Sequence, residues 1–117
     1  MFFEPMVIPK LYQDSTIFEA VDQMPQFPGG NDSLLSYISK NLKWPNIDAD
    51  VQGKVIVRFV VNIDSSISDI EILRSLDPLF DAEAIRVIKT FPKFIPGKQN
   101  GKAVNCWYTI PITFKLE

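Results

Sequence analysis

The C-terminal residues carry the pattern that most restricts the fold. From Val104 to Leu116, apolar side chains alternate with mostly polar ones, which is the period of a strand with one face on a core. Pro111 lies inside this strand, and a proline cannot donate a backbone hydrogen bond to a neighbouring strand. We therefore expect residues 103–116 to form an edge strand with one unpaired side.

Two interpretations of this edge are open. Proteins usually protect an edge strand, and Pro111 and Lys115 are residues that do so. Alternatively, the edge is left unpaired so that an extended peptide can add to it through backbone hydrogen bonds.

The preceding sequence predicts an α+β fold. Residues 53–63 are mostly β-branched and largely apolar on both faces, as in a central strand. Residues 67–73 predict a second strand after the turn formers Asp64–Ser66. Helical apolar spacing predicts helices over 31–43 and 81–91, capped by Asn31 or Asp32 and by Asp81. The expected order is helix-strand-strand-helix-strand, with two helices packed on one face of a small three-stranded antiparallel sheet.

The predicted core side chains of the two helices follow from this spacing. In the first helix they are Leu34, Leu35, Ile38 and Leu42, and in the second they are Phe80, Ala84, Val87, Ile88 and Phe91.

Residues 1–18 are expected to be a tail or lead-in segment, and residues 19–117 the domain. A short strand is one interpretation of Ile17, Phe18, Ala20 and Val21. Pro5 and Pro9 interrupt any helix near the start. Residues 24–30 hold two prolines and a glycine pair, which predicts a tight turn into the first helix. A phosphate-binding loop is disfavoured there, because no Lys-Ser/Thr pair follows.

Composition disfavours several kinds of chemistry. Histidine is absent and Cys106 is the only cysteine, so His-dependent triads and His-containing zinc sites are excluded. We expect no catalytic, cofactor or metal site, and a buried, inert Cys106. The net charge of −2 argues against nucleic-acid binding. Basic residues concentrate in the C-terminal third, where they either steer an acidic partner or peptidoglycan, or form an ordinary solvated surface.

Several short segments occur in a characteristic order. They are residues 24–30, Tyr37-Ile38, Trp44-Pro45, 53–61, 75–84, 91–102 and 108–114. This ordered set resembles the TonB C-terminal domain family of Gram-negative bacteria. One departure is Ser65, at a turn position where the family usually has glycine.

The resemblance implies a non-catalytic, periplasmic module without cofactors. Such a domain grips the TonB box of an outer-membrane transporter by strand addition and couples the proton-motive force to nutrient uptake. The family's inner-membrane anchor, through which the proton-channel complex is reached, is not evident here, so we expect an excised domain or a free-standing relative. The residues expected to flank the added peptide are Ala103, Asn105, Trp107, Thr109 and Thr113.

Alternatives stay open at this stage. The chain could be an accessory or sensor domain that binds peptidoglycan or another protein, and its open edges could pair as a homodimer. Trp107 either anchors a partner or simply covers the open face of the sheet.

Overall fold

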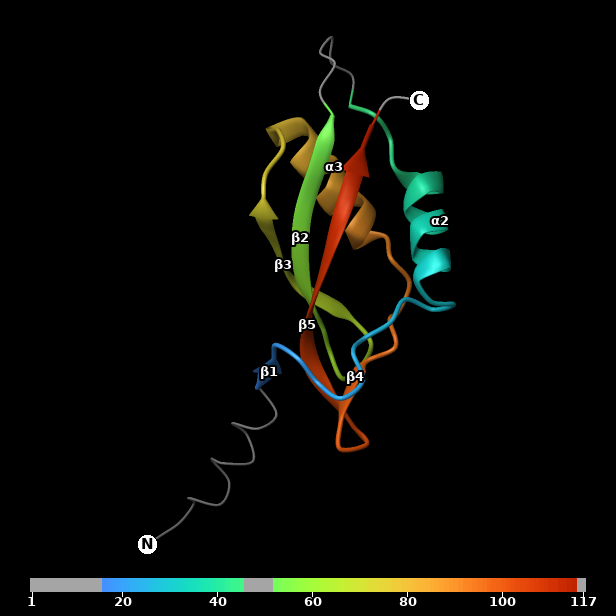
Figure 1. Ribbon diagram of the computed structural model, residues 1–117, viewed down its shortest axis with the longest axis vertical. Helices are drawn as coiled ribbons and strands as arrows, with labels where there is room; N and C mark the ends of the chain where they lie inside the picture. Colours follow the sequence, from blue (N-terminus) through green and yellow to red (C-terminus); the bar gives the residue numbers. More distant parts are fainter. Residues whose placement is uncertain (1–15, 46–51, 116–117) are drawn as a thin grey trace, which may run out of the picture.

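The computed structural model describes residues 16–45 and 52–115. Most of the predicted N-terminal segment, residues 46–51 between the first predicted helix and the strand after it, and Leu116 of the predicted last strand lie outside the described residues. The predicted boundary at residue 18 stays a prediction. The elements, shown in Figure 1, are β1 (Ile17–Phe18), α2 (Asn31–Asn41), β2 (Gly53–Val61), β3 (Ile67–Arg74), α3 (Pro78–Lys89), β4 (Gly97–Gln99) and β5 (Lys102–Phe114).

The strands form one mixed sheet. Its order is β1-β5-β2-β3, and β4 pairs with β5 as well. β2 is antiparallel to both of its neighbours, whereas β1 is parallel to β5. The prediction of two helices is confirmed, but the three-stranded antiparallel sheet is wrong, because the sheet has five strands and a parallel pair.

The two extra strands are too short to show a period of two. β1 has two residues and β4 has three. β4 lies within residues 96–101, where the Pro-Gly and Asn-Gly pairs by themselves predict only a turn. Asn100 and Gly101, with φ of 54° and 78°, form the tight connection between β4 and β5. Positive φ at both central residues is typical of two-residue hairpin loops, in which Asn-Gly is favoured.

The core lies between the sheet and the helices. β2 is the central strand, as predicted, and α3 buries Phe80, Ala84, Val87 and Ile88. α2 buries only Leu34 and Ile38. The predicted core position of Leu35 is wrong, since 64% of this residue is exposed. Adjacent helical residues differ by about 100°, so Leu34 and Leu35 cannot both face the same core.

An aromatic cluster joins the loop before α2 to the sheet. The rings of Phe27, Phe59 and Phe94 meet edge to face, with centroids 5.5 Å apart for both Phe27–Phe94 and Phe59–Phe94. Backbone hydrogen bonds between Gln26 and Ile95, of 3.0 and 2.8 Å, hold the same two segments together. This cluster fixes where α2 begins.

The helix caps differ from those predicted. Gly30, with φ 88°, precedes α2 and makes no side-chain cap bond. Asp77 caps α3 by accepting a 3.0 Å hydrogen bond from the Leu79 amide. Asp81 lies one turn further on and accepts from the Leu76 amide. The caps at Asn31 or Asp32 and at Asp81 are therefore wrong. Asn31 is already the first residue of α2, and α3 begins at Pro78, three residues before Asp81.

The turn between β2 and β3 stores backbone strain. Ser65 has φ 76°, a left-handed conformation that costs a non-glycine residue about 1 kcal/mol or more. Its amide donates to the Asn62 carbonyl and its carbonyl accepts from the Phe94 amide, so glycine would keep both bonds. We predict that Ser65→Gly raises the free energy of unfolding by about 0.5–1 kcal/mol, measured by urea denaturation.

Gly101→Ala is the matched control. Gly101 has φ 78° and open space around an added Cβ, so backbone strain alone should lower the free energy of unfolding by about 1 kcal/mol. A loss of stability in Ser65→Gly would contradict the prediction.

Candidate functional site

One edge of β5 is left largely uncovered by the described residues. On its inner side, β5 pairs with β2 without interruption, from Gly53 opposite Phe114 to Val61 opposite Cys106. On the other side, β1 pairs only with Asn105 and Cys106. Among the described residues, no strand pairs with this side of β5 beyond Cys106. We call residues 107–114 on this side the outer edge.

Pro111 shows which backbone groups point outward. It lies opposite Ile56, and the pairing with β2 continues on both sides of it. A proline fits this position because its nitrogen faces away from β2. Since backbone direction alternates along an antiparallel strand, the N–H and C=O groups of Trp107, Thr109 and Thr113 point to the outer edge as well.

The five predicted partner-binding residues fall into two groups. Ala103 lies opposite Lys98 in the β4–β5 hairpin, and Asn105 lies opposite Ile17 of β1. The Asn105 Oδ1 also accepts a 2.8 Å hydrogen bond from the Ile63 amide. Trp107, Thr109 and Thr113 instead lie along the outer edge. Whether any of the five contacts a partner stays a prediction.

Trp107 lies on the sheet face opposite the core. Its ring is half-buried beneath the Arg58 guanidinium, whose central carbon is 3.9 Å from the ring centroid. Arg58 also pairs with Glu71 at 2.9 Å and Glu19 at 3.9 Å. This stacking covers part of the ring, so Trp107 serves at least to shield the open face.

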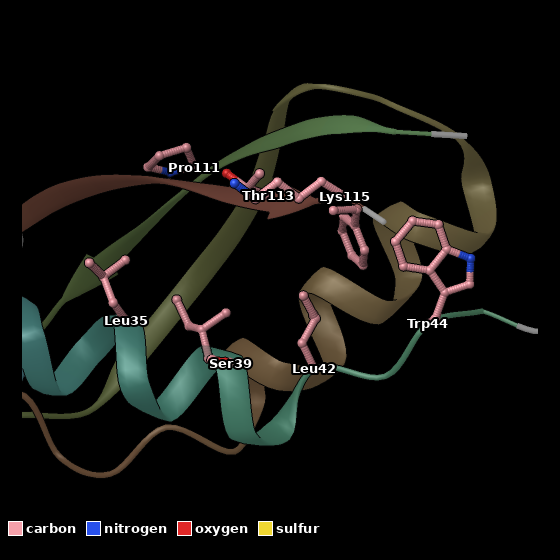
Figure 2. A pocket seen from close by; sticks show the side chains of 9 residues that line it. Leu35, Ser39, Leu42, Trp44, Pro111, Thr113 and Lys115 are labelled. Atoms are coloured by element: carbon pink, nitrogen blue, oxygen red, sulfur yellow. The ribbon is translucent and has the colours of Figure 1, made fainter. Parts of the chain in front are cut away.

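A groove runs between α2 and the outer edge. Two hollows of about 480 Å³ and about 280 Å³ share Leu35, Ile38 and Pro111 in their lining. Figure 2 shows Leu35 and Leu42 pointing from α2 toward β5, with Trp44 at one end. We call this the α2–β5 groove. Sequence reasoning missed it, because the apolar residues of α2 were all assigned to the core.

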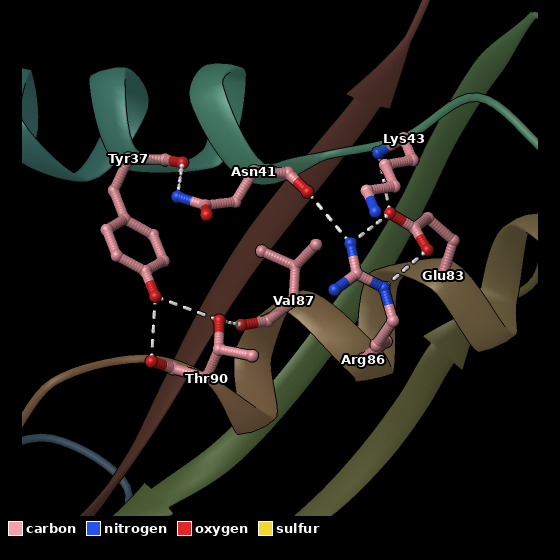
Figure 3. A network of polar contacts seen from close by, with 7 residues as sticks. All are labelled: Tyr37, Asn41, Lys43, Glu83, Arg86, Val87 and Thr90. Atoms are coloured by element: carbon pink, nitrogen blue, oxygen red, sulfur yellow. Dashed lines mark hydrogen bonds and ion pairs between the residues drawn. The ribbon is translucent and has the colours of Figure 1, made fainter.

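Side chains of α3 hold the C-terminal end of α2 in place. Figure 3 shows the Glu83 carboxylate accepting hydrogen bonds from the Lys43 amide at 2.6 Å and from Arg86 at 2.7 and 2.8 Å. Arg86 in turn donates to the Asn41 carbonyl at 2.8 Å, one of the carbonyls that a helix end leaves without an intrahelical partner. This contact sets the position of α2 at its C-terminal end.

A second contact lies one turn earlier. The Tyr37 hydroxyl donates to the Thr90 carbonyl at 2.7 Å. Together with the Glu83–Arg86 pair, it fixes α2 relative to α3 and thus the width of the α2–β5 groove.

Two titratable side chains of β5 are held in their neutral forms. Burial raises the pKa of Tyr108 and of Cys106, which keeps both neutral at pH 7. The prediction of a buried Cys106 is confirmed.

Within residues 16–45 and 52–115, no group of acidic or cysteine side chains could hold a metal ion. Neither helix in this part of the chain has the length and hydropathy of a transmembrane span.

Comparisons with known proteins identify a family and similar solved structures. The model of the family described as the Gram-negative bacterial TonB protein C-terminal matches residues 46–116. No curated protein matches the chain. Two NMR structures of the Helicobacter pylori TonB C-terminal domain are similar in fold, each with 24% identity and a TM-score of 0.55. The matches cover 74% and 77% of this chain and 92% and 87% of those chains.

The Glu83–Arg86 pair gives a pH-dependent prediction. The hydrogen bond from Arg86 is the main reason that the pKa of Glu83 lies below its ordinary value of 4.5. A depressed folded-state pKa stabilises the fold above the ordinary value, and this contribution is lost as the pH falls through the folded pKa. Glu83→Gln should lower the free energy of unfolding by about 1 kcal/mol at pH 7, a modest loss because solvent screens the pair.

The measurement is urea denaturation at a series of pH values. The difference between wild type and Glu83→Gln should shrink below pH 4.5. Glu19→Gln is the control, since the Glu19 side chain is 77% exposed and its loss should change little. A difference that stays constant down to pH 3 would show that the ion pair is not its cause.

Proposed function

The chain belongs to the family of C-terminal domains of Gram-negative bacterial TonB proteins, and from this membership we propose that it grips an extended segment of an outer-membrane transporter by strand addition to β5. Membership makes it a TonB-type envelope domain: a periplasmic module of inner-membrane-anchored proteins that serve energy transduction and transport. The family is non-enzymatic and generally interacts with TonB-dependent transporters.

The uncovered outer edge of β5 is the observation that supports strand addition. From Trp107 onward, no described strand occupies it. Unpaired backbone groups along a straight edge are what an extended peptide needs. The TonB box of a transporter is the proposed peptide.

The proposed contact runs along Trp107, Thr109 and Thr113. Ala103 and Asn105 stand just before it, where β4 and β1 pair with β5. The added strand would follow β1 along the same side of β5. Its side chains on the open face would then lie beside Trp107 and Thr109.

The same geometry suits the transmission of force. When a strand that is held by several backbone hydrogen bonds is pulled along its axis, all of these bonds bear the force at the same time. In this proposal the domain supplies the grip, and coupling to the proton-motive force is a property of the membrane-anchored family protein.

The test is an NMR titration with a synthetic TonB-box peptide from a transporter encoded in the same genome. Amide shifts should concentrate in residues 107–114. N-methylation of the peptide at single positions should give an alternating pattern. At every second residue, binding should weaken by roughly tenfold, since a lost backbone hydrogen bond costs about 1 kcal/mol or more.

The intervening peptide positions are the internal control, because their N–H groups point away from β5. Equal sensitivity at all positions, or shifts that avoid β5, would contradict strand addition. Binding of peptidoglycan fragments without any binding of the peptide would favour the accessory-domain function.

A further inference from the structure

The α2–β5 groove has an apolar surface that the fold itself does not use. Leu35 is 64% exposed on the helix side, and Trp44 is 37% exposed at one end. The groove is also lined by Ile38 and Phe114, which belong to the core. A single exposed leucine needs no explanation, but this one lies beside an unpaired strand edge.

A strand added to the outer edge would place side chains in this groove. Added strands lie about 4.8 Å from their neighbour, and their side chains alternate between the two faces of the sheet. Every second side chain would therefore face α2, and successive ones would be about 6.6 Å apart. Leu35 and Leu42 point toward the space that these side chains would enter (Figure 2).

We propose, building on the proposed function, that the α2–β5 groove selects the transporter segment by requiring apolar side chains at consecutive α2-facing positions, with Leu35 as the main specificity-determining residue. The backbone of the outer edge supplies affinity for any extended segment. The groove supplies the discrimination among such segments.

Charge and continuity identify the occupant. Lys115 alone is charged among the described residues that line the groove, so an acidic residue of the partner is favoured at that end. The groove is also continuous with the edge that strand addition would use, because Pro111 borders both. An extended segment with apolar alternation and a nearby acidic residue fits both features.

A second copy of this chain fits less well. Its β5 would have to supply the α2-facing side chains, but Ile110, Ile112 and Phe114 are at most 3% exposed in their own core. They cannot enter a neighbour's groove without unfolding that core.

The experiment compares two exposed leucines. Leu35→Ser removes the groove contact. Leu73→Ser changes a 52% exposed leucine on β3, the strand at the other edge of the sheet. Affinity for the synthetic TonB-box peptide is measured by calorimetry. Leu35→Ser should weaken binding roughly tenfold, the effect of losing one buried apolar contact. The affinity of Leu73→Ser should stay within about twofold of that of the wild type. Leu35→Met, which keeps an apolar side chain in the groove, should retain most of the wild-type affinity.

A serine scan of the peptide completes the test. Serine at the α2-facing positions should weaken binding to the wild type but much less to Leu35→Ser, because the two changes remove the same contact. Peptide binding with the expected shifts in residues 107–114 but no dependence on Leu35 would overturn this inference alone. No peptide binding by the folded wild type would overturn the proposed function together with this inference. A dimer that forms in sedimentation and excludes the peptide would do the same.

Discussion

Edge-to-face contacts among Phe27, Phe59 and Phe94 are the interaction on which the rest of the structure depends. Phe59 belongs to the central strand, Phe94 follows α3, and Phe27 precedes α2. Because α2 buries only Leu34 and Ile38, its placement relies on this cluster at one end and on the Glu83–Arg86 contact at the other. Without both, the α2–β5 groove would have no fixed wall.

The two long edges of the sheet are treated differently. On β3, Asp69 has φ 54°, the register with β2 shifts, and charged residues such as Glu71 lie along the strand. Such irregularity and charge discourage pairing with another chain. The outer edge of β5 keeps a regular register with β2 over its whole length. This asymmetry agrees with an edge kept for a partner.

The long elements could be predicted from the sequence because their periods extend over many residues. Pro111 also indicated the unpaired edge. A short strand near Ile17 is among the expectations, and β1 lies there, but its pairing with β5 could not be predicted. The short strand β4 could not be predicted, since it depends on contacts with β5 rather than on its own pattern. The groove was missed for a different reason: Leu35 and Leu42 fit an apolar stripe, and only the structure shows that Leu35 is exposed and lines a groove beside β5.

Amide hydrogen exchange in the ligand-free domain tests the unpaired edge most directly. If the outer edge is open, protection along β5 must alternate. The amides of Tyr108, Ile110 and Ile112 bond to β2 and should exchange slowly, whereas those of Thr109 and Thr113, beyond the pairing with β1, face solvent and should exchange fast. Uniform protection from Tyr108 to Phe114 would show that something already covers this edge, and would contradict the account.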